Sequence, residues 1–153
     1  MAIYNVTEKQ FIPSTVEEVW SFISSPANLK LITPDYLGFE ILTPEIPEQM
    51  YPGLIIAYKV SPVFGIKLTW VTEIKHLKEG EYFVDEQLVG PYKLWHHQHL
   101  ITSVPGGVMM TDIVYYQPPF GILGRIANRF AIRRQLRAIF DFRRKRIVEI
   151  FGQ

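Results

Sequence analysis

Hydrophobic and polar residues alternate at strand spacing over most of the chain and recur at helical spacing near both ends. Residues 2–12 alternate well enough for a strand, which Pro13 ends. Residues 14–25 begin with hydroxyl residues that can cap a helix, continue with two glutamates, and space their apolar residues by three and four. They predict a helix of about three turns. A second, short helix is predicted over residues 27–33, because the residue before Pro34 is disfavoured in a helix.

The middle of the chain consists of short runs rich in β-branched and aromatic residues, separated by glycine and proline. Separators such as "KEG", "GP" and "PGG" are short enough for hairpin turns, so these runs predict an antiparallel meander. The predicted strands are residues 36–42, 54–60, 66–77, 81–89, 93–104 and 108–117. Residues 122–151 then carry apolar residues at three- and four-residue steps and predict one long amphipathic helix.

These elements predict a single α+β domain over residues 1–153: a seven-stranded antiparallel sheet, two short helices between the first two strands, and a long C-terminal helix. One face of the sheet must be covered, and only the long helix is large enough to cover it. We therefore expect the sheet to wrap around this helix. Because a curved sheet and a straight helix diverge, the space between them is either filled by side chains or left as a cavity.

Composition excludes several classes of function. With 48% hydrophobic and 20% charged residues, the chain has the composition of a globular protein. The absence of cysteine rules out disulfides, thiolate zinc sites, iron–sulfur clusters and a cysteine nucleophile. No window is apolar enough for a membrane span and the N-terminus does not resemble a signal peptide, so we expect a cytoplasmic protein without integral membrane association. The glycine-rich nucleotide motifs and the common hydrolase motifs are also missing.

Charge is distributed unevenly along the chain. Residues 1–121 contain 7 Lys/Arg and 13 Asp/Glu, a net charge of −6, whereas residues 122–153 contain 9 and 2, a net charge of +7. A basic helix can bind nucleic acid or an anionic surface, or it can present a solvated face that pairs with acids elsewhere. We favour the solvated face and expect no nucleic-acid partner. Peripheral binding to an anionic surface through the Arg-rich helix remains a weaker alternative.

The order of elements and several motifs resemble those of the START/Bet v 1-like (SRPBCC) superfamily, whose members have the helix-grip fold. One such segment runs from Phe11 to Pro34. The others are a W-x-H-x-H strand (Trp95, His97, His99), a T-D strand ending in tyrosine (Thr111, Asp112, Tyr116), a P-x-G-x-x-G loop (Pro119, Gly121, Gly124) and an Arg-rich last helix (Arg133, Arg134, residues 140–144). They are similar to uncharacterised bacterial ligand-binding SRPBCC proteins related to the polyketide cyclase/dehydrase group. The resemblance implies a fold that binds lipids, sterols, hormones or polyketides in some members and catalyses cyclisation in others.

The segment "LWHHQH" is the sharpest candidate for chemistry. On a strand, Trp95, His97 and His99 share one face, with successive residues on that face about 6 to 7 Å apart. If the following turn is centred on residues 105–106, Asp112 lies opposite His99 on the next strand. The same register places Val114 opposite His97 and Tyr116 opposite Trp95. A turn one residue longer would move Asp112 to the other face.

Three interpretations of this cluster remain open. The first is a structural His–Asp hydrogen bond with aromatic packing on a half-exposed sheet. The second is a cavity wall in which an imidazole oriented by a carboxylate binds a polar group of a ligand or moves a proton. Alternatively, His97, His99 and Asp112 are metal ligands, a set that suits zinc or non-haem iron. Because members of the family that the chain resembles are not generally metalloproteins, we expect neither a metal nor a cofactor.

We expect the chain to bind a small, largely hydrophobic molecule, lipid-, polyketide- or aromatic-like, in a cavity between the sheet and the C-terminal helix. The expected ligand-binding residues are Trp70, Trp95, His97, His99, Met110, Asp112, Tyr116 and Phe130. Further candidates for the lining are Trp20, Phe39, Tyr58, Phe83 and Met109, with the "SPVFG" and "PPFGILG" loops as possible lips of the entrance. The alternative is a cyclase- or dehydratase-type enzyme in which His97 or His99 is the acid/base and Asp112 orients it. The sequence leaves open whether the protein is an enzyme, which ligand it binds and its oligomeric state.

Overall fold

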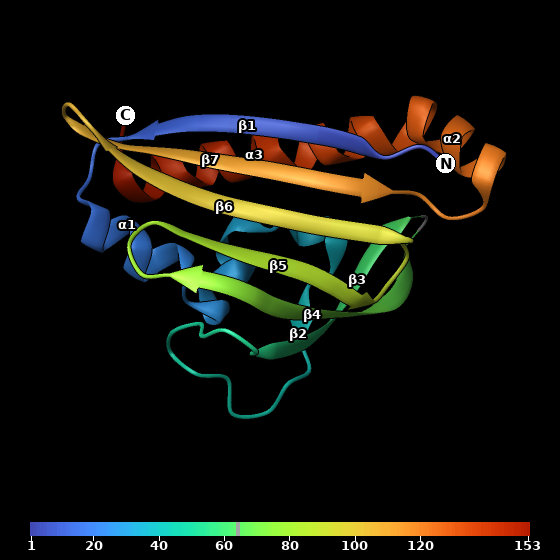
Figure 1. Ribbon diagram of the computed structural model, residues 1–153, viewed down its shortest axis with the longest axis horizontal. Coiled ribbons are helices and arrows are strands. Elements are labelled where there is room, and N and C mark those ends of the chain that lie inside the picture. Colours follow the sequence, from blue (N-terminus) through green and yellow to red (C-terminus); the bar gives the residue numbers. More distant parts are fainter. Residues whose placement is uncertain (64) are drawn as a thin grey trace.

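A seven-stranded antiparallel sheet and a long C-terminal helix make up the computed structural model, which describes residues 1–63 and 65–153 (Figure 1). The strands are β1 (Tyr4–Ile12), β2 (Glu40–Ile41), β3 (Ile55–Val63), β4 (Ile66–Lys78), β5 (Tyr82–Val89), β6 (Leu94–Val104) and β7 (Gly107–Gln117). Their order in the sheet is β1-β7-β6-β5-β4-β3-β2. From β2 to β7 each strand pairs with the next one in sequence, which confirms the predicted meander.

The short helices between β1 and β2 follow the local sequence signals. Helix α1 (Val16–Ile23) begins with a capping box, in which the Glu18 backbone N–H donates to Thr15 Oγ1 at 3.2 Å. The second predicted helix is a 3₁₀ helix, η1 (Pro26–Ile32), and a shorter one, η2 (Asp35–Leu37), follows it. Gly38 then adopts a left-handed conformation with φ of 58°. The strand predicted over residues 36–42 is therefore reduced to the two residues of β2.

The C-terminal helix is continuous but not uniform. It consists of α2 (Gly121–Ala127), a π-helical turn η3 (Asn128–Ile132) and α3 (Arg133–Phe151). The predicted long helix is confirmed, whereas the π turn was not anticipated. Gly124 permits the helix to start close to the preceding loop, because a Cβ at this position would lie 1.9 Å from the Pro119 carbonyl oxygen. Within the described residues, none of the helices combines the length and apolarity that crossing a bilayer requires.

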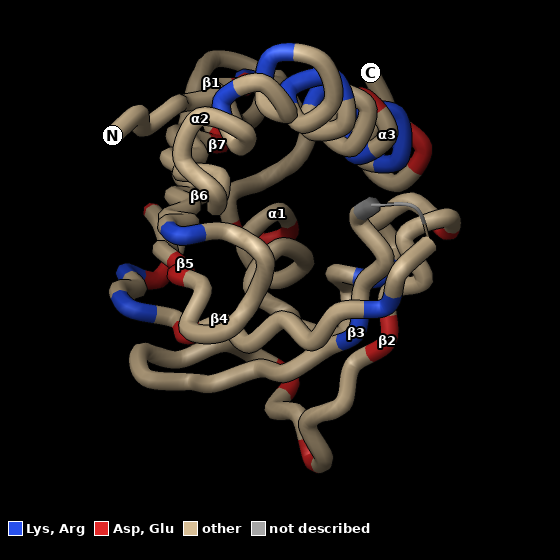
Figure 2. Tube along the Cα trace, turned by 90° about the vertical axis from the view of Figure 1, so that its right-hand side faces the viewer, with Lys and Arg blue, Asp and Glu red and all other residues tan. Residues whose placement is uncertain are grey.

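The sheet curves around the C-terminal helix, as expected (Figure 2). Leu136, Phe140 and Ile147 of α3 are buried against its concave face. Ile147 joins a larger core formed with α1 and the strands, while Leu136 and Phe140 pack with Val114 and Tyr116 of β7. The helix is thus fixed to the sheet on both sides of its middle turns.

The register of the β6–β7 hairpin agrees with the sequence prediction. Val104 pairs with Gly107 across a two-residue turn, so His99 lies opposite Asp112, and His97 opposite Val114. Asp112 therefore shares the concave face with both histidines.

Candidate functional site

A cavity of about 160 Å³ lies between the concave face of the sheet and α3. Its walls come from η1, η2, strands β3 to β6 and α3, and most of the lining side chains are apolar or aromatic. A dry apolar cavity of about 150 Å³ can hold a benzene molecule. The space therefore matches a small aromatic or branched aliphatic group.

Aromatic rings form one wall of this cavity. Tyr58 and Trp70 face each other across β3 and β4 and stack with ring centroids 6.1 Å apart. Trp95 meets Trp70 edge to face at 5.2 Å, and Tyr92 lies 4.9 Å from Trp95. Because each ring is held by its neighbours, this wall is a rigid apolar surface.

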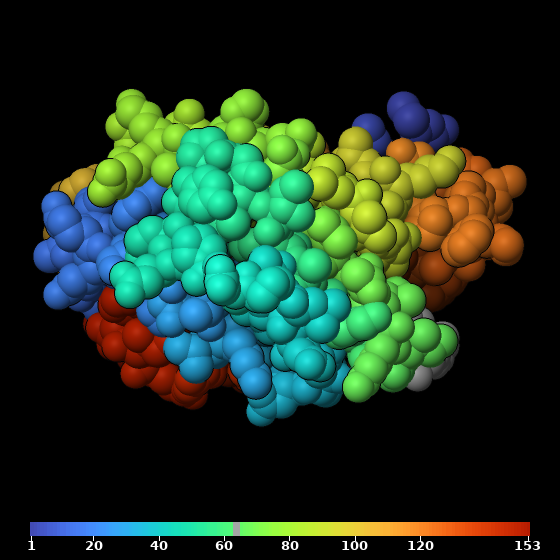
Figure 3. All heavy atoms as spheres, turned by 90° about the horizontal axis from the view of Figure 1, so that it is seen from below, coloured from blue at the N-terminus to red at the C-terminus, as the bar shows by residue number. Residues whose placement is uncertain are grey.

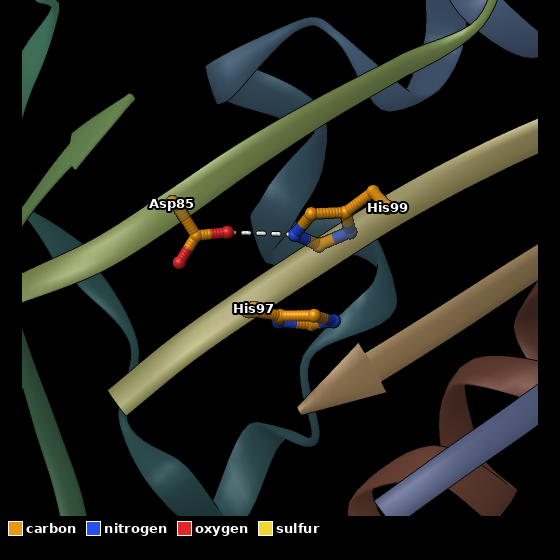
Figure 4. A group of neighbouring side chains, drawn as sticks. All are labelled: Asp85, His97 and His99. Atoms are coloured by element: carbon orange, nitrogen blue, oxygen red, sulfur yellow. Dashed lines mark hydrogen bonds and ion pairs between the residues drawn. The ribbon is translucent and has the colours of Figure 1, made fainter. Parts of the chain in front are cut away.

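Ionisable side chains also line the cavity, and Figure 4 shows Asp85 of β5 with His97 and His99 of β6. His99 Nε2 donates to Asp85 Oδ2 at 2.6 Å, and His99 Nδ1 lies 3.1 Å from Asp112 Oδ1. His97 Nε2 donates to Asp112 Oδ1 at 2.9 Å, and Arg143 Nη1 of α3 approaches the same oxygen at 3.3 Å. We call these five residues, Asp85, His97, His99, Asp112 and Arg143, the buried His–Asp network.

Contacts within the network shift the pKa values of Asp85, Asp112 and His99 toward their charged forms. Burial opposes ionisation of Asp112, but Arg143 and the two histidines outweigh this effect and hold the pKa of Asp112 well below its usual range. Burial also opposes ionisation of Asp85, yet the hydrogen bond from His99 and the nearby positive charges lower the pKa of Asp85. Burial disfavours the cationic form of His99 as well, but its hydrogen bonds to both carboxylates raise its pKa. These contacts thus favour the carboxylate forms of Asp85 and Asp112 and the imidazolium form of His99.

His97 differs from His99 in both charge and contacts. Burial, reinforced by the neighbouring His99 charge, lowers the pKa of His97 to about 4, so this imidazole is neutral near pH 7. Its Nε2–H donates to Asp112, which leaves a lone pair on Nδ1. No other described residue makes a hydrogen bond to this Nδ1, although His97 lines the cavity. His97 can therefore accept a proton or a hydrogen bond from a molecule in the cavity.

Two buried donors at the cavity also lack partners. Trp70 Nε1 and Arg143 Nε are both buried, and neither finds an acceptor in residues 1–63 or 65–153. Trp70 and Arg143 both line the cavity. A buried N–H without an acceptor costs free energy, which a bound oxygen atom would recover.

Asp85, His97 and His99 can each offer one ligand atom to a metal ion, and these atoms lie within 4.8 Å of one another. Two histidines and one carboxylate form a set that suits zinc or non-haem iron. The sequence predicted His97, His99 and Asp112 as the possible metal ligands, whereas the structure places Asp85 with the two histidines. Both nitrogens of His99 already contact a carboxylate, so a cation would have to displace one of these contacts.

The structure brings some of the expected ligand-binding residues together and separates others. Those that line the cavity are Trp70, Trp95, His97 and His99, together with the further candidates Phe39, Tyr58 and Phe83. Asp112 is buried behind the histidines, and Met110, Tyr116 and Trp20 are buried outside the lining. Met109 also lies outside it, and Phe130 is 71% exposed. Phe120 of the "PPFGILG" loop is 79% exposed, and Phe64 of "SPVFG" lies outside the described residues.

Sequence reasoning missed Asp85 and Arg143. Asp85 lies opposite His97 in the β5–β6 pair, on the same face as the buried Phe83. The sequence signal for Asp85 was an acidic residue at an inward-facing position of a predicted strand. Placing this acid beside the histidines would also have required the register of the β5–β6 pair. Arg143 had no comparable signal, because the helix carries many arginines and only its packing selects one of them.

Comparisons with known proteins identify the fold. No protein-family model matches the chain, and no curated protein matches it in sequence. Among solved structures, Ara h 8.0201 aligns with a TM-score of 0.62 at 10% identity, covering 97% of this chain and 99% of that one. Protein CV1439 from Chromobacterium violaceum aligns with a TM-score of 0.72 at 12% identity, covering 97% and 98%. A nucleoside-diphosphate sugar epimerase from Corynebacterium glutamicum aligns with a TM-score of 0.64 at 22% identity, covering 94% of this chain and 28% of that one. The protein therefore has a Bet v 1-like helix-grip fold.

Proposed function

We propose that the protein reversibly binds a small, largely apolar ligand in the cavity between the sheet and α3. The observation that carries this proposal is the cavity of about 160 Å³ with its aromatic wall. Binding would be driven by burial of apolar ligand surface, at about 25 cal/mol for each Å². The Bet v 1-like fold supports ligand binding in general terms.

The ligand we propose carries an uncharged oxygen acceptor such as a carbonyl group. The unpartnered N–H groups of Trp70 and Arg143 would donate to that oxygen. An anionic ligand is disfavoured, because Arg143, the arginine that lines the cavity, already pairs with Asp112 at 3.3 Å and a further charge in an apolar cavity would be unpaired. Small aromatic ketones and aldehydes are the simplest molecules with these properties.

Isothermal titration calorimetry with three probes of similar size tests this proposal. Acetophenone has the carbonyl, isopropylbenzene lacks it, and benzoate is charged. We expect acetophenone to bind about tenfold more tightly than isopropylbenzene, which corresponds to one net hydrogen bond of about 1.4 kcal/mol. Benzoate should bind most weakly. Equal affinity for acetophenone and isopropylbenzene would contradict the proposal that the ligand carries an oxygen acceptor. If none of the three probes binds, the proposed class of small aromatic ligands is wrong.

Three variants locate the binding. Trp70→Phe keeps an aromatic ring but removes the N–H, so the preference for acetophenone should shrink while isopropylbenzene still binds. Trp95→Phe is the matched control, because it shrinks another ring of the same wall and should affect both probes alike. Ile139→Trp would place a larger side chain in the cavity and should weaken both. If Ile139→Trp leaves both affinities unchanged, the probes bind elsewhere.

A second candidate function is proton transfer of the kind that a cyclase or dehydratase needs. It is favoured by His97, whose neutral ring is oriented by Asp112 and keeps one nitrogen free, whereas both nitrogens of His99 are engaged. His97 Nδ1 would remove a proton from the carbon next to a bound carbonyl, and the enolate oxygen would accept from the nearby donors.

Deuterium exchange into the methyl group of acetophenone in heavy water, followed by NMR, measures this activity. The wild-type protein should accelerate the exchange over buffer, and His97→Gln should reduce the acceleration by about 10² or more. Binding without acceleration would leave the protein a binder and exclude this catalytic candidate.

A further inference from the structure

The first turns of the C-terminal helix expose an unusual amount of apolar surface. Apart from Met1, the four most exposed large apolar side chains of the described residues are Phe120 (79%), Leu123 (71%), Phe130 (71%) and Ile122 (66%). Ile126 in the same stretch is 51% exposed. These five residues form what we call the tip patch. Their segment, coloured orange, lies at one end of the molecule in Figure 3.

The patch belongs to one side of a helix that is firmly anchored on the other side. Residues Ile122, Ile126 and Phe130 are spaced by four and share a face. Gly124 and Asn128, which lie on the other side of the helix, are buried. Asn128 Oδ1 accepts a hydrogen bond from the Tyr116 hydroxyl at 2.7 Å. The exposed face is therefore a fixed feature of the fold, and its apolar side chains cannot turn inward without breaking this anchor.

Arginines surround the apolar face. Arg125, Arg129, Arg133, Arg134 and Arg137 are all exposed, and none of them forms an ion pair with any residue that the structure describes. The sequence contains no acidic residue between Asp112 and Asp141. The helix thus presents large apolar side chains and unpaired positive charges on the same surface.

We propose that the tip patch docks the protein onto an anionic lipid bilayer. An interfacial helix inserts bulky apolar side chains into the boundary between headgroups and acyl chains, while its basic residues attract anionic lipids. Phe120, Leu123 and Phe130 would insert, and the five arginines would contact lipid phosphates. A second copy of the chain fits less well, because two such patches would bring like charges together. Nucleic acid would leave the apolar side chains without a partner.

The position of the patch relative to the cavity gives this docking a consequence. Gln135 and Leu136, which line the cavity, lie in the first turn of α3 after the π turn, one to two turns from Phe130. A docked protein would therefore hold the cavity beside the membrane surface.

Co-sedimentation with lipid vesicles tests the proposal. The wild-type protein should bind vesicles that mix phosphatidylcholine with phosphatidylglycerol, bind phosphatidylcholine alone much more weakly, and be released as sodium chloride is raised. Phe130→Ser should weaken the binding by about tenfold, and Arg129→Gln by about fivefold. The matched controls are Leu88→Ser and Lys67→Gln, which remove an exposed apolar and an exposed basic side chain elsewhere, and both should bind like the wild type.

Several outcomes would overturn the docking surface. They are failure of the wild type to bind anionic vesicles, equal binding to neutral vesicles, and loss of binding in the control variants to the same extent as in the patch variants. A stable dimer that Phe130→Ser dissociates, measured by analytical ultracentrifugation, would assign the patch to a second copy instead. Because these side chains are exposed, the variants should keep the wild-type melting temperature, so loss of binding cannot be ascribed to unfolding.

Discussion

At the residue scale, His97 and His99 differ sharply although they lie two positions apart on β6. Their rings stack with centroids 3.7 Å apart, so they share a local environment. Both nitrogens of His99 reach a carboxylate, whereas His97 reaches one carboxylate through one nitrogen. The second contact of His99 is with Asp85. This additional contact with an acid on a neighbouring strand helps to raise the pKa of His99, whereas the pKa of His97 is lowered.

The opposite pKa shifts predict how stability changes with pH. The pKa of His97 falls from 6.5 to about 4 on folding, so between these values the unfolded chain binds the extra proton and stability decreases as pH is lowered. Asp85 and Asp112 have lowered pKa values, and their contribution is lost below their ordinary value of 3.8. The pKa of His99 is raised, so its contribution is complete below 6.5 and is lost as pH rises through the folded value.

Urea unfolding at several pH values measures these effects. His97→Gln should flatten the decrease in the free energy of unfolding between about pH 6.5 and pH 4, while the loss at high pH stays. A wild-type free energy of unfolding that does not change across this acidic window would contradict the neutral state of His97.

Loss of the Asp112 carboxylate should lower the free energy of unfolding more than loss of an exposed carboxylate that pairs with a histidine. Asp112→Asn leaves the charge of Arg143 undercompensated in a buried site and weakens the contact with His99, so we expect a loss of about 3 to 5 kcal/mol in the free energy of unfolding. Glu86→Gln is the matched control, since Glu86 pairs with His96 at 2.8 Å but is 38% exposed, and it should cost about 1 kcal/mol or less. Similar losses in the two variants, measured by urea unfolding, would show that burial adds nothing to the network.

At the scale of elements, the C-terminal helix depends on one anchor at its π turn. Tyr116 is fully buried on β7, and its hydroxyl donates to Asn128 Oδ1. This hydrogen bond joins the end of β7 to the first turns of the helix, on the side opposite the tip patch. Arg143 and Ile147 hold the helix on the other side of the cavity.

Removing one hydroxyl tests the anchor. Tyr116→Phe leaves the Asn128 side chain buried without its donor, so the free energy of unfolding should fall by about 1 to 3 kcal/mol. Tyr115→Phe, the matched change at the neighbouring position, affects a side chain that is 39% exposed and should have almost no effect. If both variants have the melting temperature of the wild type, the hydrogen bond does not anchor the helix.

Helices, strands and turns that depend on residues close together in the sequence could be predicted. Contacts between residues far apart in the sequence could not. The β6–β7 register followed from a two-residue turn, so the position of Asp112 opposite His99 was predictable. Asp85 entered the site through the β5–β6 pairing, and β5 also carries register shifts against β4 that no local pattern reveals. The π turn coincides with the buried contact between Asn128 and Tyr116, which only the assembled fold defines.

At the scale of the whole molecule, the cavity exists because a straight helix crosses a curved sheet and is fixed on both sides of the crossing. Between the anchor at Asn128 and the contacts of Arg143 and Ile147, Leu136 and Ile139 of the helix face the cavity lining of the sheet. The aromatic wall and three members of the His–Asp network, Asp85, His97 and His99, form the opposite side. The hollow is therefore built into the architecture, and two of the residues that line it, Trp70 and Arg143, carry unpartnered N–H donors.

The indole N–H resonance of Trp70 gives the most direct test of ligand binding in this cavity. The chain contains three tryptophans, and Trp70→Phe identifies which ¹⁵N-correlated indole signal belongs to Trp70. Titration with acetophenone should move this signal downfield, because the indole N–H donates to the carbonyl oxygen, whereas isopropylbenzene should produce no downfield shift. A Trp70 signal that stays unchanged at saturating acetophenone would contradict binding at this site.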